Sequence, residues 1–177
     1  MSAPDAVPDE VVDVAVFDVD GVLADVTHRR HLIEGRRRWP EFFAAAVDDT
    51  PLSTGIGLAR AAAQKGLQLV YLSGRPEHLR RVTVEWFERH DVPPGDLLLR
   101  PHRDRSPATD LKLRLLRQLS RERRVVFFVD DDTEVVDAVR AAEPPIVHGE
   151  CVLAGWQPGG ARARRAMRRA QQDAGGT

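Results

Sequence analysis

An apolar run that ends abruptly in two aspartates is the feature that most constrains the fold of this chain. Residues 14–17 (Val-Ala-Val-Phe) are followed by Asp18, Val19, Asp20 and Gly21. A short apolar run bounded by a turn residue is typical of a fully buried strand. Carboxylates at its end would lie where open α/β folds bind their ligands. Because two such close carboxylates repel each other, one is protonated or a cation lies between them. The segment therefore predicts a metal site or an acid–base site.

The overall composition favours an ordinary globular domain. The 177 residues are 42% hydrophobic and 30% charged, and the net charge of −1 gives no global basic field for nucleic acid. A single cysteine, Cys151, excludes an internal disulfide and is consistent with a reducing compartment. The first ten residues lack the apolar core of a signal peptide, and no apolar run approaches the ~18 residues of a membrane span. We therefore expect a cytoplasmic protein that does not contact a membrane.

Strand-like and helix-like segments alternate along the chain. This alternation predicts an α/β fold, a three-layer sandwich around a central parallel sheet in which the first strand is internal. We expect one domain at 11–158 with a small insert at about 26–50, a flexible arm at 1–10 and an Arg-rich tail at 159–177. The predicted strands are 11–17, 67–72, 97–99, 125–129 and 145–148, and the predicted helices are 28–34, 40–47, 54–65, 77–90, 109–119 and 133–142.

Polar side chains follow three of the predicted strands. Besides Asp18 and Asp20, Ser73 and Arg75 follow the second strand, and residues 130–132 are three consecutive aspartates. The carboxyl ends of parallel strands share one edge of the sheet, so these groups converge there, together with Lys112 from a neighbouring helix. Carboxylates, a hydroxyl and cations in one place suit a phosphate-handling site with a hard metal ion.

The chain resembles the haloacid dehalogenase-like superfamily. The resemblance spans roughly residues 11–147 and implies a Rossmann-like fold with a minimal cap. It also implies that Ser73 hydrogen-bonds a phosphoryl oxygen and that Lys112 offsets negative charge. The four motifs that carry the resemblance are Phe17-Asp18-Val19-Asp20-Gly21-Val22-Leu23, Ser73, Lys112 and Val129-Asp130-Asp131.

The same resemblance implies a mechanism of phosphomonoester hydrolysis. Asp18 would attack phosphorus to form an aspartyl-phosphate, and Asp20 would act as the general acid and then as the general base. Mg²⁺ would be held by Asp18, by the backbone carbonyl of Asp20 and by Asp130 as the first choice or Asp131 as the second. An acid at position 20 favours a phosphatase or phosphomutase over the dehalogenases and pump ATPases of the superfamily.

A narrower resemblance points to the 3′-phosphatase domain of polynucleotide kinase and its stand-alone bacterial relatives. It implies that Arg75, beside Gly74, clamps the phosphate and that Arg29 is a second phosphate contact; the alternative is that both arginines are ordinary loop charges. The chain departs from the viral-type domain at Ala108 and Asp132, and no Gly-x-x-x-x-Gly-Lys-Ser/Thr loop of a kinase occurs. Motifs shared with these domains are Ser73-Gly74-Arg75, Thr83, Trp86, Leu98-Leu99-Arg100 and Asp131-Asp132-Thr133-Glu134-Val135-Val136.

The spacing of the motifs bears on the substrate. About fifty residues separate Asp18 from Ser73, which is too few for a full cap domain. The open site favours a bulky substrate such as a nucleic-acid 3′-phosphate end or a nucleotide-like ester, with Trp39, Phe42 and Phe43 of the insert partly covering it. Two alternatives stay open: a 5′-nucleotidase-type or broad small-molecule phosphatase, and a catalytically idle protein that binds phosphate or a partner. The oligomeric state is not predicted.

Overall fold

The computed structural model of the chain describes residues 11–34 and 37–158. The predicted arm at 1–10 and the Arg-rich tail at 159–177 lie outside the described residues. Within the described ranges, no helix has both the length and the apolar character needed to cross a bilayer.

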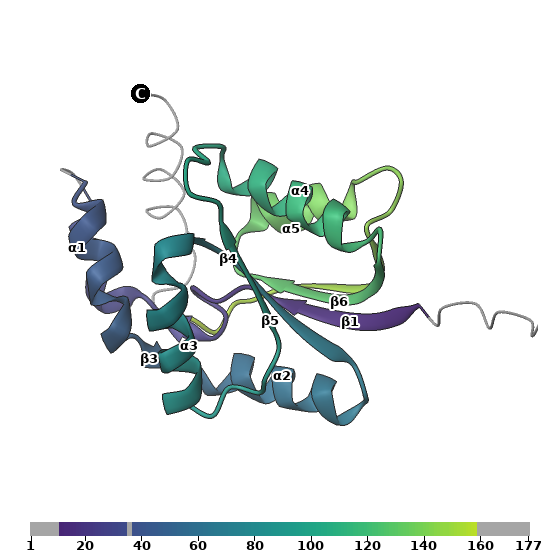
Figure 1. The fold of residues 1–177 in the computed structure, drawn as a ribbon, viewed down its shortest axis with the longest axis horizontal. Coiled ribbons are helices and arrows are strands. Elements are labelled where there is room, and N and C mark those ends of the chain that lie inside the picture. The colour runs from purple at the N-terminus through teal and green to yellow at the C-terminus, as the bar shows by residue number, and fades with distance from the viewer. Residues whose placement is uncertain (1–10, 35–36, 159–177) are drawn as a thin grey trace, which may run out of the picture.

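The described chain is built around a five-stranded parallel sheet (Figure 1). Its strand order is β5-β4-β1-β6-β7, so β1 is central, as the sequence predicts. The apolar run of β1 is fully buried because neighbours flank it on both edges and helices cover both faces. The strands are β1 (Val12–Phe17), β4 (Gln68–Pro76), β5 (Asp96–Arg100), β6 (Arg123–Asp130) and β7 (Val147–Leu153).

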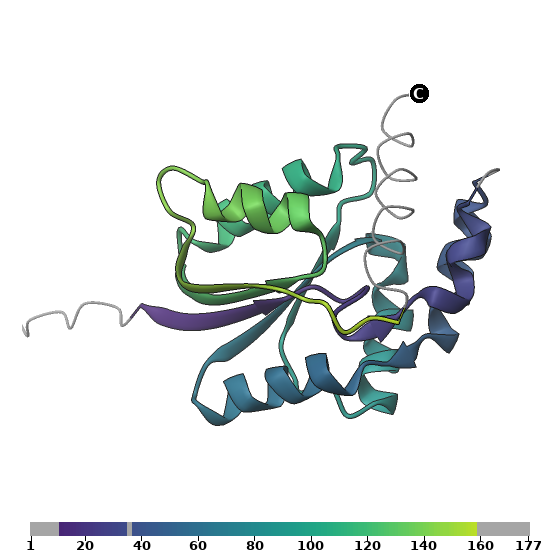
Figure 2. The same ribbon diagram turned by 180° about the vertical axis from the view of Figure 1, so that it is seen from behind.

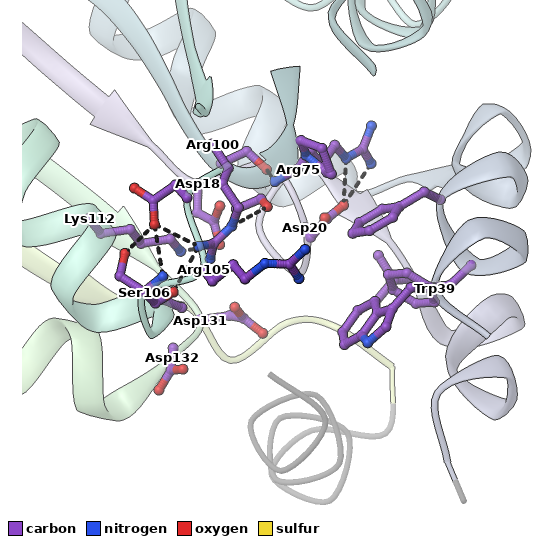
Figure 3. Close-up of a pocket in the computed structure, with 18 of the residues that line it drawn as sticks. Asp18, Asp20, Trp39, Arg75, Arg100, Arg105, Ser106, Lys112, Asp131 and Asp132 are labelled. Carbon is purple, nitrogen blue, oxygen red and sulfur yellow. Dashed lines mark hydrogen bonds and ion pairs between the residues drawn. The ribbon is translucent and has the colours of Figure 1, made fainter. Parts of the chain in front are cut away.

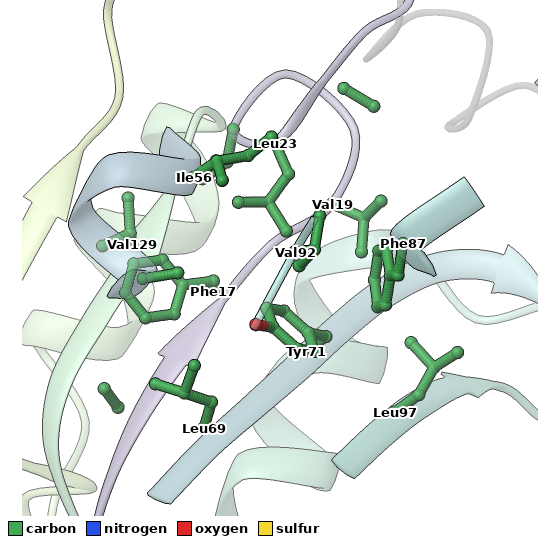
Figure 4. Packing of buried hydrophobic residues seen from close by; sticks show 14 of the residues in the cluster. Phe17, Val19, Leu23, Ile56, Leu69, Tyr71, Phe87, Val92, Leu97 and Val129 are labelled. Carbon is green, nitrogen blue, oxygen red and sulfur yellow. The ribbon is translucent and has the colours of Figure 1, made fainter. Parts of the chain in front are cut away.

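Two pairs of helices cover the sheet and complete the predicted sandwich (Figures 1 and 2). Ala15 and Phe17 of β1 pack toward α2 (Ser53–Gln64) and α3 (Arg80–Arg89), which a short η3 helix (Glu77–Leu79) precedes. Val14 and Val16 pack toward α4 (Ala108–Leu119) and α5 (Thr133–Arg140) on the other face. Alternating side chains of β1 thus pack into two separate hydrophobic cores, one on each face of the sheet. Figure 4 shows the core on the α2 and α3 side, around Phe17, Tyr71 and Phe87.

The last strand exists as predicted, but its predicted bounds were wrong. The sequence indicates a strand at 145–148, whereas β7 runs from Val147 to Leu153. It is an edge strand with several exposed residues, so it lacks the apolar pattern that marks a buried strand. Gly149 is also a residue type that predicts a turn, but in β7 it allows the two strand backbones to approach closely. A Cβ on Gly149 would lie 1.9 Å from the Val126 carbonyl oxygen.

The insert lies beyond the carboxyl ends of the strands (Figures 1 and 2). A two-stranded antiparallel sheet joins its ends, pairing Asp25 with Thr50. The predicted helices of the insert are shorter than the sequence indicates, and the second passes into a 3-10 turn. Its elements are β2 (Ala24–Asp25), the 3-10 helix η1 (Thr27–Leu32), α1 (Trp39–Ala44), the 3-10 helix η2 (Ala45–Asp48) and β3 (Thr50–Pro51).

The start of α2 packs directly on the loop that follows β1, and two glycines test this contact. A Cβ on Gly55 would lie 1.9 Å from the Val22 carbonyl oxygen, whereas a Cβ on Gly57 would meet nothing within 4 Å. We expect Gly55→Ala to lower the free energy of unfolding by about 1–3 kcal/mol through overpacking. Gly57→Ala should raise it by about 0.4–1 kcal/mol, because alanine restricts the unfolded chain. Urea denaturation measures both, and equal stabilisation by the two changes would contradict the contact.

Candidate active site

The predicted site residues converge at the carboxyl edge of the sheet. Asp18 follows β1, Asp130 ends β6, Ser73 and Arg75 lie in the last part of β4, and Lys112 reaches in from α4. All of them except Asp130 line a pocket of about 300 Å³ whose other walls come from the insert and from the loop before α4 (Figure 3). The structure therefore brings together side chains that are up to 112 residues apart in the sequence.

One half of the site is an acidic cluster around Lys112. Carboxylate oxygens of Asp18, Asp130 and Asp131 all lie within 4.8 Å of one another. The Lys112 ammonium nitrogen lies 2.9 Å from Asp18 Oδ2 and 2.6 Å from Asp130 Oδ2. Burial raises the pKa of Asp18 well above its ordinary value, although Lys112 opposes the shift. With all three carboxylates ionised, one ammonium leaves the cluster with two excess negative charges.

The three consecutive aspartates have different surroundings. Asp130 is fully buried, and its Oδ2 is bonded to Lys112 while its Oδ1 accepts the Asp132 backbone N–H at 2.9 Å. Asp132 caps α5 by accepting the Glu134 backbone N–H at 2.9 Å. Asp131 lines the pocket, and its carboxylate has no hydrogen-bond or ion-pair partner among the described residues. Burial and then the neighbouring Asp130 charge raise the pKa of Asp131 to about 7.

Gly21 and Gln157 complete the surroundings of Asp131. A Cβ on Gly21 (φ +85°) would lie 2.3 Å from Asp131 Oδ2 and 2.5 Å from Gln157 Oε1. Gln157 Oε1 is buried and has no hydrogen-bond partner among the described residues. Unpaired oxygens grouped in this way, next to a cluster with excess negative charge, are the donor set that a hard divalent cation requires. The residues present therefore fit a Mg²⁺ ion.

The other half of the site is a cluster of two carboxylates and two buried guanidinium groups. Asp20 Oδ1 accepts from Arg75 Nη2 at 2.6 Å and from Arg29 Nη2 at 2.9 Å. Asp49 accepts from Arg29 Nε at 2.6 Å and from Arg75 Nη2 at 2.7 Å. These four side chains balance in charge, unlike the cluster around Lys112. Burial would raise the pKa of Asp20, but Arg75 and Arg29 outweigh it and lower that pKa to about 2.

The two arginines that were predicted to contact phosphate differ in their access to the pocket. Both are fully buried, but Arg75 lines the pocket and Arg29 is not among its lining residues. Ser73 is also buried at the pocket wall, and its hydroxyl oxygen accepts the Arg75 backbone N–H at 3.2 Å. Gly74, which also lines the pocket, accepts from Arg100 Nε at 3.3 Å.

Asp49 and Gln157 are residues of the site that the sequence did not reveal. Asp49 lies in a run, Asp-Asp-Thr-Pro, that is typical of a solvated turn. It is 2% exposed, and its backbone carbonyl accepts the Trp86 indole N–H at 2.8 Å. Gln157 follows the last strand and carries no motif. The one available signal for Asp49 was that Arg29 and Arg75 need an acidic partner.

Comparisons with known proteins identify the family to which the chain belongs. Residues 12–147 match the model of a protein family that is described as the polynucleotide kinase PNKP phosphatase domain. The chain belongs to this family. Membership confirms the haloacid dehalogenase-like resemblance and makes the chain a phosphatase, a hydrolase of phosphoric monoesters. No curated protein matches the chain.

Several solved structures share the fold of this chain. Two structures of the Pnkp1/Rnl/Hen1 complex, one described as an RNA repair complex, match at 23% and 22% identity with TM-scores of 0.66 and 0.68. Each match covers 84% of this chain and 47% or 44% of the other. A class C acid phosphatase from Bacillus anthracis with tungstate bound matches at 19% identity and a TM-score of 0.56, covering 70% of this chain and 54% of that one. The chain thus spans about half the length of these matches.

Proposed function

We propose that the protein is a Mg²⁺-dependent phosphomonoesterase that forms an aspartyl-phosphate on Asp18 and acts on a nucleic-acid 3′-phosphate end or a nucleotide-like ester. The observation that carries this proposal is the grouping of Asp18, Asp130 and Asp131 around Lys112 at the base of a pocket that Ser73 and Arg75 also line. Such a site combines a nucleophile, a metal-binding carboxylate set and phosphate-binding donors.

The proposed reaction has two steps at the same phosphorus atom. In the first, an Asp18 carboxylate oxygen forms a bond to phosphorus, and the bond from phosphorus to the leaving oxygen breaks while Asp20 supplies a proton to that oxygen. In the second, Asp20 takes a proton from water, the water oxygen bonds to phosphorus and the bond to Asp18 breaks. Asp20 lines the same pocket and lies two residues from Asp18. Because Arg75 and Arg29 lower the pKa of Asp20 to about 2, it can supply a proton only once the entering phosphate takes Arg75 away from it and so raises that pKa.

We assign the metal to the unpaired side of the acidic cluster. Asp131 and Asp18 would hold Mg²⁺, with the Asp20 backbone carbonyl implied as a further ligand. Asp130 belongs to the same cluster, but unlike Asp18 and Asp131 it does not line the pocket, and both of its oxygens are bonded. We therefore assign Asp130 chiefly to holding Lys112. We thus prefer Asp131 to Asp130 as the metal ligand, which is the reverse of the preference drawn from the sequence. When bound, the ion neutralises charge that builds up on the transferring phosphoryl group.

Ser73 and Arg75 are the proposed phosphate contacts, and Arg29 is proposed as a positioning residue behind them. Arg75 Nη2 is shared between Asp20 and Asp49, so a phosphoryl oxygen entering the pocket competes with Asp20 for that donor. Arg29 is held by Asp20, Asp49 and the Phe42 carbonyl oxygen, and this fixes Asp20 from the side away from the pocket. Arginine suits both positions because its donors form a rigid fork.

The substrate assignment rests on family membership and on the shape of the pocket. The family is that of polynucleotide kinase phosphatase domains, and the insert between β2 and β3 walls only one side of the pocket. A panel of a 3′-phosphorylated oligonucleotide, its 5′-phosphorylated isomer and the mononucleotides tests this choice. We expect the highest kcat/KM for the 3′-phosphorylated oligonucleotide. A preference for mononucleotides would support the small-molecule alternative, and no phosphate release from any ester would support the idle one.

Removal of divalent metal is expected to stop phosphate release. Chelation with EDTA should reduce kcat by at least about a thousand-fold, because the lost charge stabilisation amounts to several kcal/mol, and Mg²⁺ in excess should restore it. Asp131→Asn should weaken Mg²⁺ binding measured by calorimetry, whereas Asp137→Asn, a change in an exposed aspartate of α5 that does not line the pocket, should leave it unchanged. Undiminished phosphate release in EDTA would rule out a metal-dependent mechanism.

A further inference from the structure

We propose that Trp39 and Arg105, on opposite walls of the pocket, form a subsite for the terminal nucleotide of the leaving group. The indole would stack on its base, and the guanidinium would bind the phosphodiester on its 5′ side. This proposal rests on the proposed function and adds the residues that distinguish a nucleic-acid end from other phosphomonoesters.

The wall formed by Trp39 and Phe43, here called the aromatic wall, presents a flat apolar surface to the pocket. The two rings stack with centroids 5.5 Å apart and an interplanar angle of 22°. Phe42 packs edge-on against both and is 1% exposed, with the Arg29 guanidinium 4.2 Å from its ring centroid. Phe42 therefore anchors the wall, while Trp39 and Phe43 stay half-buried and line the pocket.

Arg105 supplies a cation on the facing wall. It is exposed, lines the pocket, and forms no hydrogen bond or ion pair within the part of the chain that the structure describes. Figure 3 shows its side chain extending toward the side of the pocket that holds Trp39. Its neighbour Arg100 is committed to the protein, since Nη1 donates to the Ser106 carbonyl oxygen at 2.8 Å and Nε to that of Gly74 at 3.3 Å. Arg100 fixes the loop, and Arg105 is free to bind.

The chemistry of the two walls selects one class of leaving group. A half-buried indole favours a flat ring, because aromatic stacking on a base contributes about 1–3 kcal/mol. A free guanidinium favours a second anion at some distance from the reacting phosphate. A nucleotide at a 3′-phosphorylated end carries both, whereas a small sugar phosphate has no ring and a phosphoserine peptide has no flanking phosphodiester. The volume of about 300 Å³ is at the lower limit of ligand pockets, which suits the end of a chain.

Three substrates separate the two contacts. They are a 3′-phosphorylated oligonucleotide, the same oligonucleotide with an abasic terminal residue, and β-glycerol phosphate, which has neither ring nor second phosphate. We expect Trp39→Ala to lower the ratio of kcat/KM for the oligonucleotide to that for β-glycerol phosphate by about ten- to a hundred-fold. The abasic substrate should show no such loss, and Trp39→Phe should retain most of the ratio because it keeps a ring.

Arg105→Gln should lower kcat/KM for both oligonucleotides relative to β-glycerol phosphate. It should also reduce the slope of log kcat/KM against log salt by about 0.7, the value for one lost contact to a single strand. The matched control is Arg103→Gln, an exposed arginine of the same loop that does not line the pocket.

The outcomes distinguish the subsite from the underlying reaction. Equal losses on all three substrates in Trp39→Ala and Trp39→Phe would overturn the subsite and indicate a structural role. The same salt slope in wild type, Arg105→Gln and Arg103→Gln would overturn the assignment of Arg105. Failure of the wild type to hydrolyse any of the three esters would instead overturn the proposed function itself.

Discussion

Replacing Asp18 by asparagine is expected to reduce phosphate release by at least about a thousand-fold, because the amide is no nucleophile toward phosphorus. Asp18 is 4% exposed, lies in the pocket and has its carboxylate 2.9 Å from the Lys112 ammonium nitrogen. Release of inorganic phosphate from an aryl phosphate with Mg²⁺ measures the effect. A residual rate above about a tenth of the wild-type rate would exclude Asp18 as the nucleophile.

The loss in Asp18→Asn should not arise from unfolding. Burial already raises the pKa of Asp18, so a neutral amide of the same shape should leave the urea midpoint unchanged or raise it. Asp20→Asn provides the complementary test. An aryl leaving group needs little protonation, so this variant should form the aspartyl-phosphate and fail to hydrolyse it. Label from ³²P-substrate should then accumulate on Asp20→Asn, as a hydroxylamine-sensitive adduct, and be absent from Asp18→Asn.

The sequence predicted those parts of the site that the ends of buried strands determine. Asp18 and Ser73 follow apolar runs that can only be internal strands, and parallel pairing then brings their ends together. Lys112 could be placed because an amphipathic helix returns it to the same edge. In each case a local pattern and one topological rule were sufficient.

The features that were missed depend on tertiary contacts that no local pattern encodes. Asp49 is buried because the pairing of β2 with β3 and the indole of Trp86 hold the end of the insert over the sheet edge. Gln157 becomes a pocket residue only because the chain crosses back past Asp130, where the Ala154 backbone N–H bonds to the Asp130 carbonyl oxygen at 2.8 Å. The extent of β7 was missed for a related reason, since an edge strand lacks the apolar signature of the central ones.

The charges of the two halves of the site explain why Asp49, from a polar turn, is buried in its interior. With its three carboxylates ionised, the cluster around Lys112 has excess negative charge that a metal ion can neutralise. Asp20, in contrast, faces two guanidinium groups, and a single carboxylate would leave one buried positive charge uncompensated. Asp49 supplies the missing negative charge. Its burial is therefore a requirement of Arg29 and Arg75.

Replacing Asp49 by alanine is expected to lower the free energy of unfolding by about 3–5 kcal/mol, the usual effect of removing one partner from a buried ion pair. The two arginines would keep only Asp20 as a counter-charge. Arg75 would also lose an anchor 2.7 Å away, so kcat should fall by about a hundred-fold in the protein that stays folded. The matched control is Asp48→Asn, a change in the exposed neighbour, which should alter neither quantity.

A double variant separates charge balance from the loss of a particular contact. Combining Asp49→Leu with Arg29→Met removes one charge of each sign and leaves the Asp20–Arg75 pair intact. If uncompensated buried charge is the cause, this protein should recover at least half of the stability lost in Asp49→Ala. Its activity should stay low, because Asp20 would lose the Arg29 contact that fixes it. Additive destabilisation in the double variant would show that the two side chains act independently, against the charge balance argued for the pair.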